Sequence, residues 1–141
     1  MEHILTKVNV NRVGVSIAMA SIFATVTAIF GEITQIHKLL FAVMLLDYVS
    51  GVSAAIVNKS VSSKKAHIGV IKKISIIALV AFSHQVDIYL GTNVVCTGVI
   101  AFFIANEFMS VMENYRNIGL PIPDKLVKVM DVFAKTESKN G

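Results

Sequence analysis

The fold class is decided by the second apolar run of the chain, residues 39–57, which reads LLFAVMLLDYVSGVSAAIV. Its only charged residue is Asp47. A hydrocarbon core of about 30 Å is crossed by roughly 20 apolar residues in an α-helix. The run is long and apolar enough to meet this requirement, so the sequence predicts a membrane-spanning helix here.

Three further apolar runs have a similar length and cover residues 13–30, 74–90 and 94–112. The whole chain is 55% hydrophobic and 16% charged, against about 25% charged for an ordinary soluble domain. This excess of apolar surface requires lipid rather than water. The sequence predicts an all-α integral membrane bundle of about four transmembrane helices, forming a single membrane domain over residues 1–141.

The first run, residues 13–30, is moderately apolar and rich in small residues such as Gly14, Ala18 and Ala24. Two arrangements follow from this composition. In one, the run crosses the membrane as the first of four spans. In the other, the first run lies in the membrane interface as a helix, and only the three later runs cross the membrane.

The distribution of Lys and Arg predicts the orientation of the chain. Residues 1–12, 58–73 and 113–141 hold twelve of these residues together, whereas residues 31–38 and 91–93 hold one. Basic residues in short loops collect on the cytoplasmic side of a membrane. We therefore expect a multi-pass protein of the bacterial cytoplasmic membrane with both termini in the cytoplasm.

The C-terminal part is predicted to form a cytoplasmic tail, residues 113–141. Pro121 and Pro123 stop the preceding helix, because proline lacks an amide donor and restricts the residue before it. After them, Leu126, Met130 and Phe133 recur at helical spacing among charged residues. This pattern predicts a short amphipathic helix suited to an anionic membrane surface or to a neighbouring subunit.

Polar and small residues form stripes along three of the predicted spans. In the second span, Asp47, Ser50 and Gly51 fall on one helical face. A carboxylate near the bilayer centre costs roughly 2.5–3.5 kcal/mol, so Asp47 is expected to face protein or water. The third and fourth spans contribute further polar residues: His84, Asp87, Asn106, Glu107, Ser110 and Glu113.

Two interpretations of these polar stripes remain open. A single chain could bury the stripes against one another, with Asp47 or Glu107 held by His84 or a nearby amide. Alternatively, the stripes could face an aqueous lumen once several copies assemble. Four helices, each about 10 Å wide, enclose no wide hole, so a large lumen would need many subunits.

Residues 58–73 form a basic segment between the second and third spans. It is expected to fix the topology of the chain and to contact anionic lipid. Its lysines are Lys59, Lys64, Lys65, Lys72 and Lys73.

Residue patterns that carry enzymatic chemistry are missing from this sequence. It contains no catalytic triad, phosphate-binding glycine loop or metal-ligand cluster, so neither a cofactor nor a metal is expected and the chain is not predicted to be an enzyme. Cys96 is expected to be a packing residue, and His3, His37 and His67 to be solvated. Because the basic residues flank apolar runs instead of forming one patch, no nucleic-acid partner is expected.

Several blocks resemble the toxin-secretion and phage-lysis holin family, which are bacteriophage holins of the clostridial toxin-secretion type. The blocks are DYVSG at 47–51, the lysine-rich segment 59–73, FFIANEFMSVMEN at 102–114 and GLPIP at 119–123. The resemblance covers about residues 41–130. Met109 stands where the family has leucine or a similar residue, and the first 38 residues match little.

This resemblance implies a small protein that accumulates in the cytoplasmic membrane and assembles as a homo-oligomer. The resulting lesion would permeabilise the membrane and lead to release of an endolysin or a large toxin. Two other functions remain open on the residues alone. One is a small ion channel with His84, Asp87 and Glu107 as a relay, and the other is an antiholin that regulates an active holin.

Overall fold

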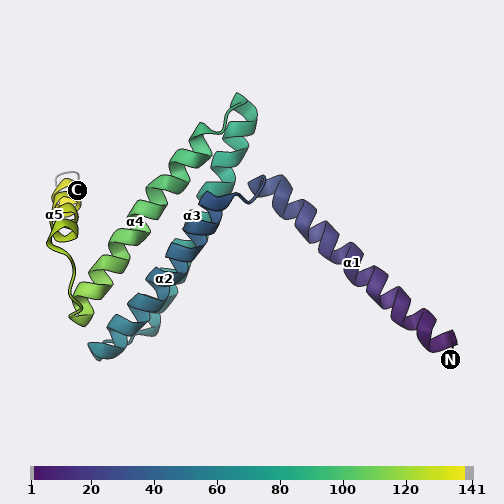
Figure 1. Ribbon diagram of the computed structural model, residues 1–141, viewed down its shortest axis with the longest axis horizontal. Helices are drawn as coiled ribbons and strands as arrows, with labels where there is room; N and C mark the ends of the chain where they lie inside the picture. The colour runs from purple at the N-terminus through teal and green to yellow at the C-terminus, as the bar shows by residue number, and fades with distance from the viewer. Residues whose placement is uncertain (1, 139–141) are drawn as a thin grey trace.

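The computed structural model describes the backbone of residues 2–138 and the side chains of residues 12–132. Within this part the chain is helical and contains no strand (Figure 1). Four of the helices are long and apolar enough to cross a membrane, which confirms the predicted fold class. The five helices are α1 (Glu2–Phe30), α2 (Gln35–Val57), α3 (Ser63–Leu90), α4 (Val94–Ile118) and α5 (Asp124–Ser138).

Helices α2, α3 and α4 form a three-helix bundle in which successive helices run in opposite directions (Figure 1). The Asn58 side chain donates a hydrogen bond of 3.0 Å to the carbonyl of Asn117, which ties the end of α2 to the end of α4. Gly91 and Gly119 end α3 and α4 with φ of +67° and +82°, a conformation that costs glycine little. Because Asn58 contacts Asn117, the α2–α3 turn and the end of α4 lie at the same end of the bundle.

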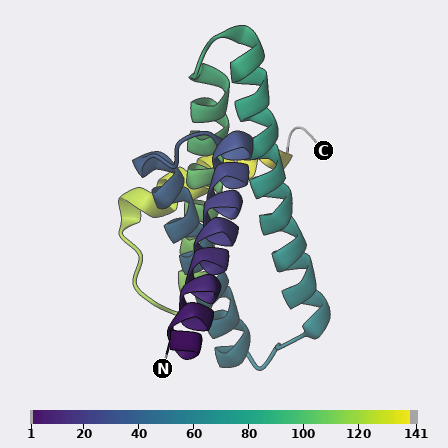
Figure 2. The ribbon, with the colours of Figure 1, turned by 90° about the vertical axis from the view of Figure 1, so that its right-hand side faces the viewer.

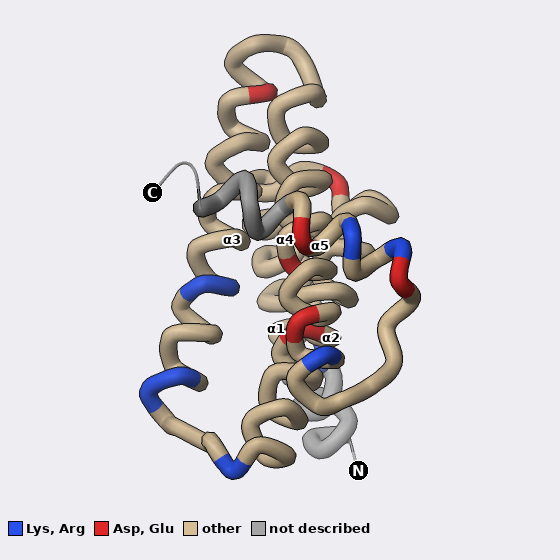
Figure 3. Tube along the Cα trace, turned by 90° about the vertical axis from the view of Figure 1, so that its left-hand side faces the viewer, with Lys and Arg blue, Asp and Glu red and all other residues tan. Residues whose placement is uncertain are grey.

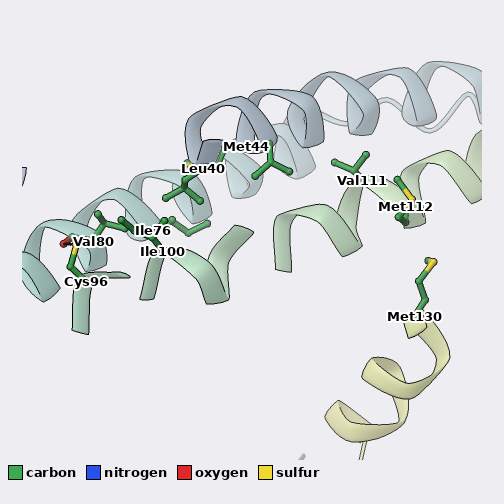
Figure 4. Packing of buried hydrophobic residues seen from close by; sticks show 10 residues of the cluster. Leu40, Met44, Ile76, Val80, Cys96, Ile100, Val111, Met112 and Met130 are labelled. Carbon is green, nitrogen blue, oxygen red and sulfur yellow. Dashed lines mark hydrogen bonds between the residues drawn. The ribbon is translucent and has the colours of Figure 1, made fainter. Parts of the chain in front are cut away.

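Helix α4 lies at the centre of the packing, because both α2 and α3 contact it extensively and touch each other little. One buried cluster contains Leu40 and Met44 of α2, Ile76 of α3 and Ile100 of α4 (Figure 4). Ile100 is fully buried. Cys96 is buried in the same core, as predicted. Many large apolar side chains on the outer faces are exposed, as expected for helices surrounded by lipid.

Helix α1 leaves the bundle and does not lie alongside it (Figure 1); in the view of Figure 2 it stands in front of the bundle. Its apolar segment Arg12–Phe30 has no buried residue. The attachment is local: the Gln85 side-chain amide of α3 donates to the carbonyls of Ala28 and Ile29, at 3.2 and 3.1 Å. Beyond this attachment, the other described residues of the chain leave the apolar segment of α1 uncovered.

Helix α5 folds back toward α4 and buries Met130, which is 4% exposed, in the apolar cluster that includes Met112 (Figure 4). The predicted amphipathic helix is therefore present, although the side chain of Phe133 lies outside the described residues. Arg116 and Asp131 approach to 3.9 Å, but both are more than half exposed, and such pairs contribute little stability.

Two expectations from the sequence are corrected by the fold. The basic segment 58–73 is mostly helical, because α3 begins at Ser63 instead of near residue 74. His37 is not solvated: it is 7% exposed and its Nδ1 lies 2.9 Å from the hydroxyl of Thr34. His67 is exposed as expected, and the side chain of His3 lies outside the described residues.

The position of Ile100 predicts a strong dependence of the bundle on its packing. Ile100→Ala should lower the free energy of unfolding by about 2 kcal/mol or more, because it opens a cavity among three helices. Ile74→Ala removes a side chain that is 61% exposed, so it should change the stability by less than about 0.5 kcal/mol. Reversible unfolding in mixed detergent micelles measures both. Equal effects would contradict the described core.

Candidate functional site

Three charged side chains from three different helices meet inside the bundle. The Lys73 ammonium of α3 donates a hydrogen bond of 2.8 Å to the carboxylate of Asp47 on α2 and another to the carboxylate of Glu107 on α4. The three side chains are 16%, 16% and 9% exposed, respectively. We call Asp47, Lys73 and Glu107 the ion triad. Asp47 and Glu107 lie close to the middle of their helices.

A network of neutral groups supports the ion triad. The amide of Asn114, on α4, donates to the Asp47 carboxylate at 3.1 Å and to the Ser50 hydroxyl at 3.0 Å. Gly51 faces the Asn114 amide, and a Cβ atom there would lie 3.4 Å from the amide nitrogen, in van der Waals contact. The small and polar stripe of α2 is therefore a docking face for α4.

The electrostatics of the ion triad favour an intact bundle. One ammonium stands between two carboxylates, so neither acid is left without a cation at membrane depth. Removing one partner of a buried ion pair typically costs about 3–5 kcal/mol, since the remaining charge stays buried and unpaired. Among the described residues, Lys73 is the residue of α3 that forms hydrogen bonds with both acids.

Asp87 belongs to a second polar site, at the opposite end of the bundle. Its carboxylate accepts hydrogen bonds from the backbone amides of Val95 and Cys96, at 3.1 and 2.7 Å, and from the Thr92 hydroxyl. These amides belong to the first turn of α4, where a negative charge is favourable. Asp87, which is 1% exposed, therefore caps α4 across the α3–α4 turn.

The predicted polar residues thus separate into three groups. Asp47, Ser50 and Glu107 come together at the ion triad, with Ser110 nearby at the α2–α3 cavity. Among the described residues, His84 and Asp87 form no hydrogen bond or ion pair with each other, and Asp87 directs both oxygens toward the start of α4. The remaining two, Asn106 and Glu113, are exposed on the outer face of α4.

Lys73 was assigned to the basic segment on sequence grounds, but its side chain is part of the ion triad. A usable signal exists in the sequence once α3 is taken to begin at Ser63. Lys73 then shares one helical face with the four buried residues of α3, which are Ile76, Val80, Ser83 and Asp87. The other basic positions of the segment remain at the surface of the α2–α3 turn and the beginning of α3, which are marked blue in Figure 3.

Among the side chains of residues 12–132, no group of three or more His, Cys, Asp or Glu residues is arranged to hold a metal ion. The chemistry that this part of the chain offers is that of charge pairing and hydrogen bonding within apolar helices.

Comparison with known sequences gives the family. A sequence model of the bacteriophage holin family matches residues 24–135, which include the end of α1 and all of α2, α3 and α4. The chain belongs to the bacteriophage holin family. The ion triad and the Asp87 cap both lie within the part of the holin chain that matches.

Relatives of this holin family member come from bacteria and from a phage. A protein of Bacillus phage phi105 named a probable holin is 31% identical over 96 residues, covering 67% of this chain and 70% of the relative. An uncharacterised protein of Listeria monocytogenes is 38% identical over 114 residues, covering 80% and 79%. A 14.9 kDa uncharacterised protein of Clostridium perfringens is 34% identical over 108 residues, covering 74% and 80%. No solved structure matches the holin chain.

The ion triad generates a prediction for stability. Lys73→Met should lower the free energy of unfolding by about 3–5 kcal/mol, because Asp47 and Glu107 then lose their cation within the bundle. Lys72→Met removes the same charge from an exposed neighbouring position and should have little effect. Unfolding in mixed micelles measures the difference.

A compensating variant distinguishes charge pairing from side-chain packing. Asp47→Asn and Glu107→Gln, added to Lys73→Met, remove the uncompensated charges and should restore most of the lost stability. If the triple variant is less stable than Lys73→Met alone, unpaired charge is not the cause of the defect.

Proposed function

We propose that this holin family member oligomerises in the bacterial cytoplasmic membrane and opens a lesion that permeabilises it. Passage of an endolysin or a large toxin and lysis of the host cell would follow. Family membership supports the general role, and the phi105 relative carries the name of a probable holin. The proposals of oligomerisation and lesion formation rest on the arrangement of polar side chains.

One observation carries the proposal of an assembly: the inward-facing polar residues of the bundle are paired, yet polar residues remain exposed outside it. Lys73 contacts both inward-facing acids and Asn114 donates to Asp47, so the polar stripes are held together within a single chain. Asn106, near the middle of α4, and Glu113 are exposed on the outside. A polar side chain facing lipid at this depth is unfavourable, whereas a neighbouring chain or a water-filled hole would solvate it.

Helix α1 provides a second reason for contact between chains. Its segment Arg12–Phe30 has no buried residue, although it is apolar enough to cross a membrane. Small residues such as Gly14, Ala18 and Ala20 permit close approach by another helix. We propose that α1 and the outer face of α4 contribute most of the contacts between subunits.

The charge distribution supports an orientation with both termini in the cytoplasm. The basic α2–α3 turn and the end of α4 lie at one end of the bundle, and the α3–α4 turn, without Lys or Arg, lies at the other. Short basic loops remain on the cytoplasmic side. In this orientation α5 lies on the side of the anionic inner leaflet. The proposed role is that of a membrane protein without enzymatic activity.

The ion-channel alternative finds less support in the geometry. His84 and Lys73 are eleven residues apart on α3, which corresponds to about 16 Å along the helix. Asp87 is engaged in capping α4, and Glu107 in the ion triad. These groups therefore do not form a continuous relay across the membrane, and no described contact favours a regulatory antiholin role.

Expression of the full chain in a bacterium tests the proposed function. We expect a sudden loss of membrane potential after a period of accumulation, followed by leakage and by lysis when an endolysin is co-expressed. Membrane potential, efflux of a cytoplasmic reporter enzyme and optical density measure these steps. Normal growth and potential at a high membrane level of the protein would contradict the lesion, and would point to the antiholin.

The exposed amide on α4 predicts an effect on timing. Asn106→Leu should delay or abolish lysis, because it replaces a polar group of the proposed lumen with an apolar one, while insertion into the membrane stays unchanged. Phe102→Leu alters an exposed residue one turn earlier, which is 65% exposed, and should leave the timing close to normal. Identical lysis times for Asn106→Leu and the unmodified chain would exclude Asn106 from the lumen.

A further inference from the structure

A cavity separates α2 from the first half of α3 at the basic end of the bundle. Its volume is about 330 Å³, and Ser110 and Asn114 of α4 form part of its inner wall. The two helices on its sides touch each other little, so protein atoms do not close the gap. We call it the α2–α3 cavity.

The α2–α3 cavity combines cationic, hydroxyl and apolar walls, and the Asp47–Lys73 ion pair also lines it. Lys65 and Lys72 line it, and both side chains are exposed and form no ion pair within residues 12–132. They are seven residues apart on α3, so they lie on one helical face at two heights about 10 Å apart. The apolar part of the wall is formed by Tyr48, Val52, Ala55, Val61, Ala66 and Ile68.

Gly69 shows that the space is not needed for packing within the chain. It lines the cavity in the interior of α3, and a Cβ atom placed on it would meet no atom within 4 Å. Glycine inside a helix costs about 1 kcal/mol relative to alanine. No protein neighbour makes use of the space that this glycine leaves open.

We infer that the α2–α3 cavity binds the headgroup of an anionic phospholipid. Lys65 and Lys72 hold the phosphate, with the hydroxyls of Ser60 and Ser62 as further donors, and an acyl chain lies along the apolar wall. A lipid fits better than a soluble anion, because the cavity lies at the basic end of membrane-spanning helices and pairs its cations with apolar surface. Anionic lipids attract basic residues at this depth.

This inference refines the role expected of the basic segment. Lys73 lines the cavity but its ammonium is already paired with Asp47 and Glu107, and Lys59 and Lys64 do not line the cavity. Two of the five lysines therefore carry the specific binding. The inference depends on membrane insertion but not on lesion formation, so it can fail while the proposed function holds.

Lipid binding to the full chain provides the test. The protein is reconstituted in phosphatidylcholine nanodiscs containing a small fraction of phosphatidylglycerol, and retained phosphatidylglycerol is counted by native mass spectrometry. A double variant, Lys65→Gln with Lys72→Gln, should bind it about 30-fold more weakly, taking about 1 kcal/mol for each lysine. The control, Lys59→Gln with Lys64→Gln, loses the same charge on the same segment and should retain binding. Equal loss in both would overturn the cavity as the site.

A second variant tests the cavity without changing any charge. Gly69→Leu fills the open space and should abolish retention of phosphatidylglycerol, whereas Gly14→Leu, on α1, also faces open space and should not. Retention by Gly69→Leu would overturn the site even if the lysine variants behave as expected. Displacement of the lipid by millimolar inorganic phosphate would identify a soluble-anion site and overturn the lipid assignment.

Discussion

The constraint on which this structure depends is that a charge within apolar helices must find its partner in protein. Lys73 satisfies it for Asp47 and Glu107 together, at 2.8 Å from the first and in direct contact with the second. Because the three residues lie on three helices, the same interaction fixes their relative register. Asn114 and Ser50 then complete the hydrogen bonding of Asp47. Polar residues that would be unfavourable in lipid thus form the specific contacts between α2, α3 and α4.

The pairing of the inward polar residues changes where a membrane lesion would form. Lys73 and Asn114 hold the polar faces of α2, α3 and α4 against one another within one chain. The surfaces that remain unsatisfied are outside: the apolar α1 and the polar residues Asn106 and Glu113 of α4. Both kinds of surface gain from contact with further copies, one through packing and the other through solvation. A compact unit with unsatisfied outer faces is consistent with a protein that accumulates singly before it assembles.

Much of the fold could be predicted from the hydropathy of the sequence and from the residues that end helices. Four apolar runs, Gly119 and the two following prolines predict α1 to α5, because each helix is specified by its own residues. The site was predicted less well. Lys73 was assigned to a loop since the apolar run of α3 begins only after it, and its role depends on two acids that lie 26 and 34 positions away. The cap that Asp87 forms on α4 and the burial of His37 were not predicted, because both depend on tertiary packing and leave no local pattern.

Solid-state NMR on the full chain in lipid bilayers tests the ion triad most directly. With ¹⁵N-labelled lysine and ¹³C-labelled carboxylates, a dipolar correlation reports whether the Lys73 nitrogen lies within hydrogen-bonding distance of an acid. Correlations from this nitrogen to both Asp47 and Glu107 are expected. If both carboxylates correlate only with water while α2, α3 and α4 are inserted and folded, the polar interior is hydrated and the closed bundle is wrong.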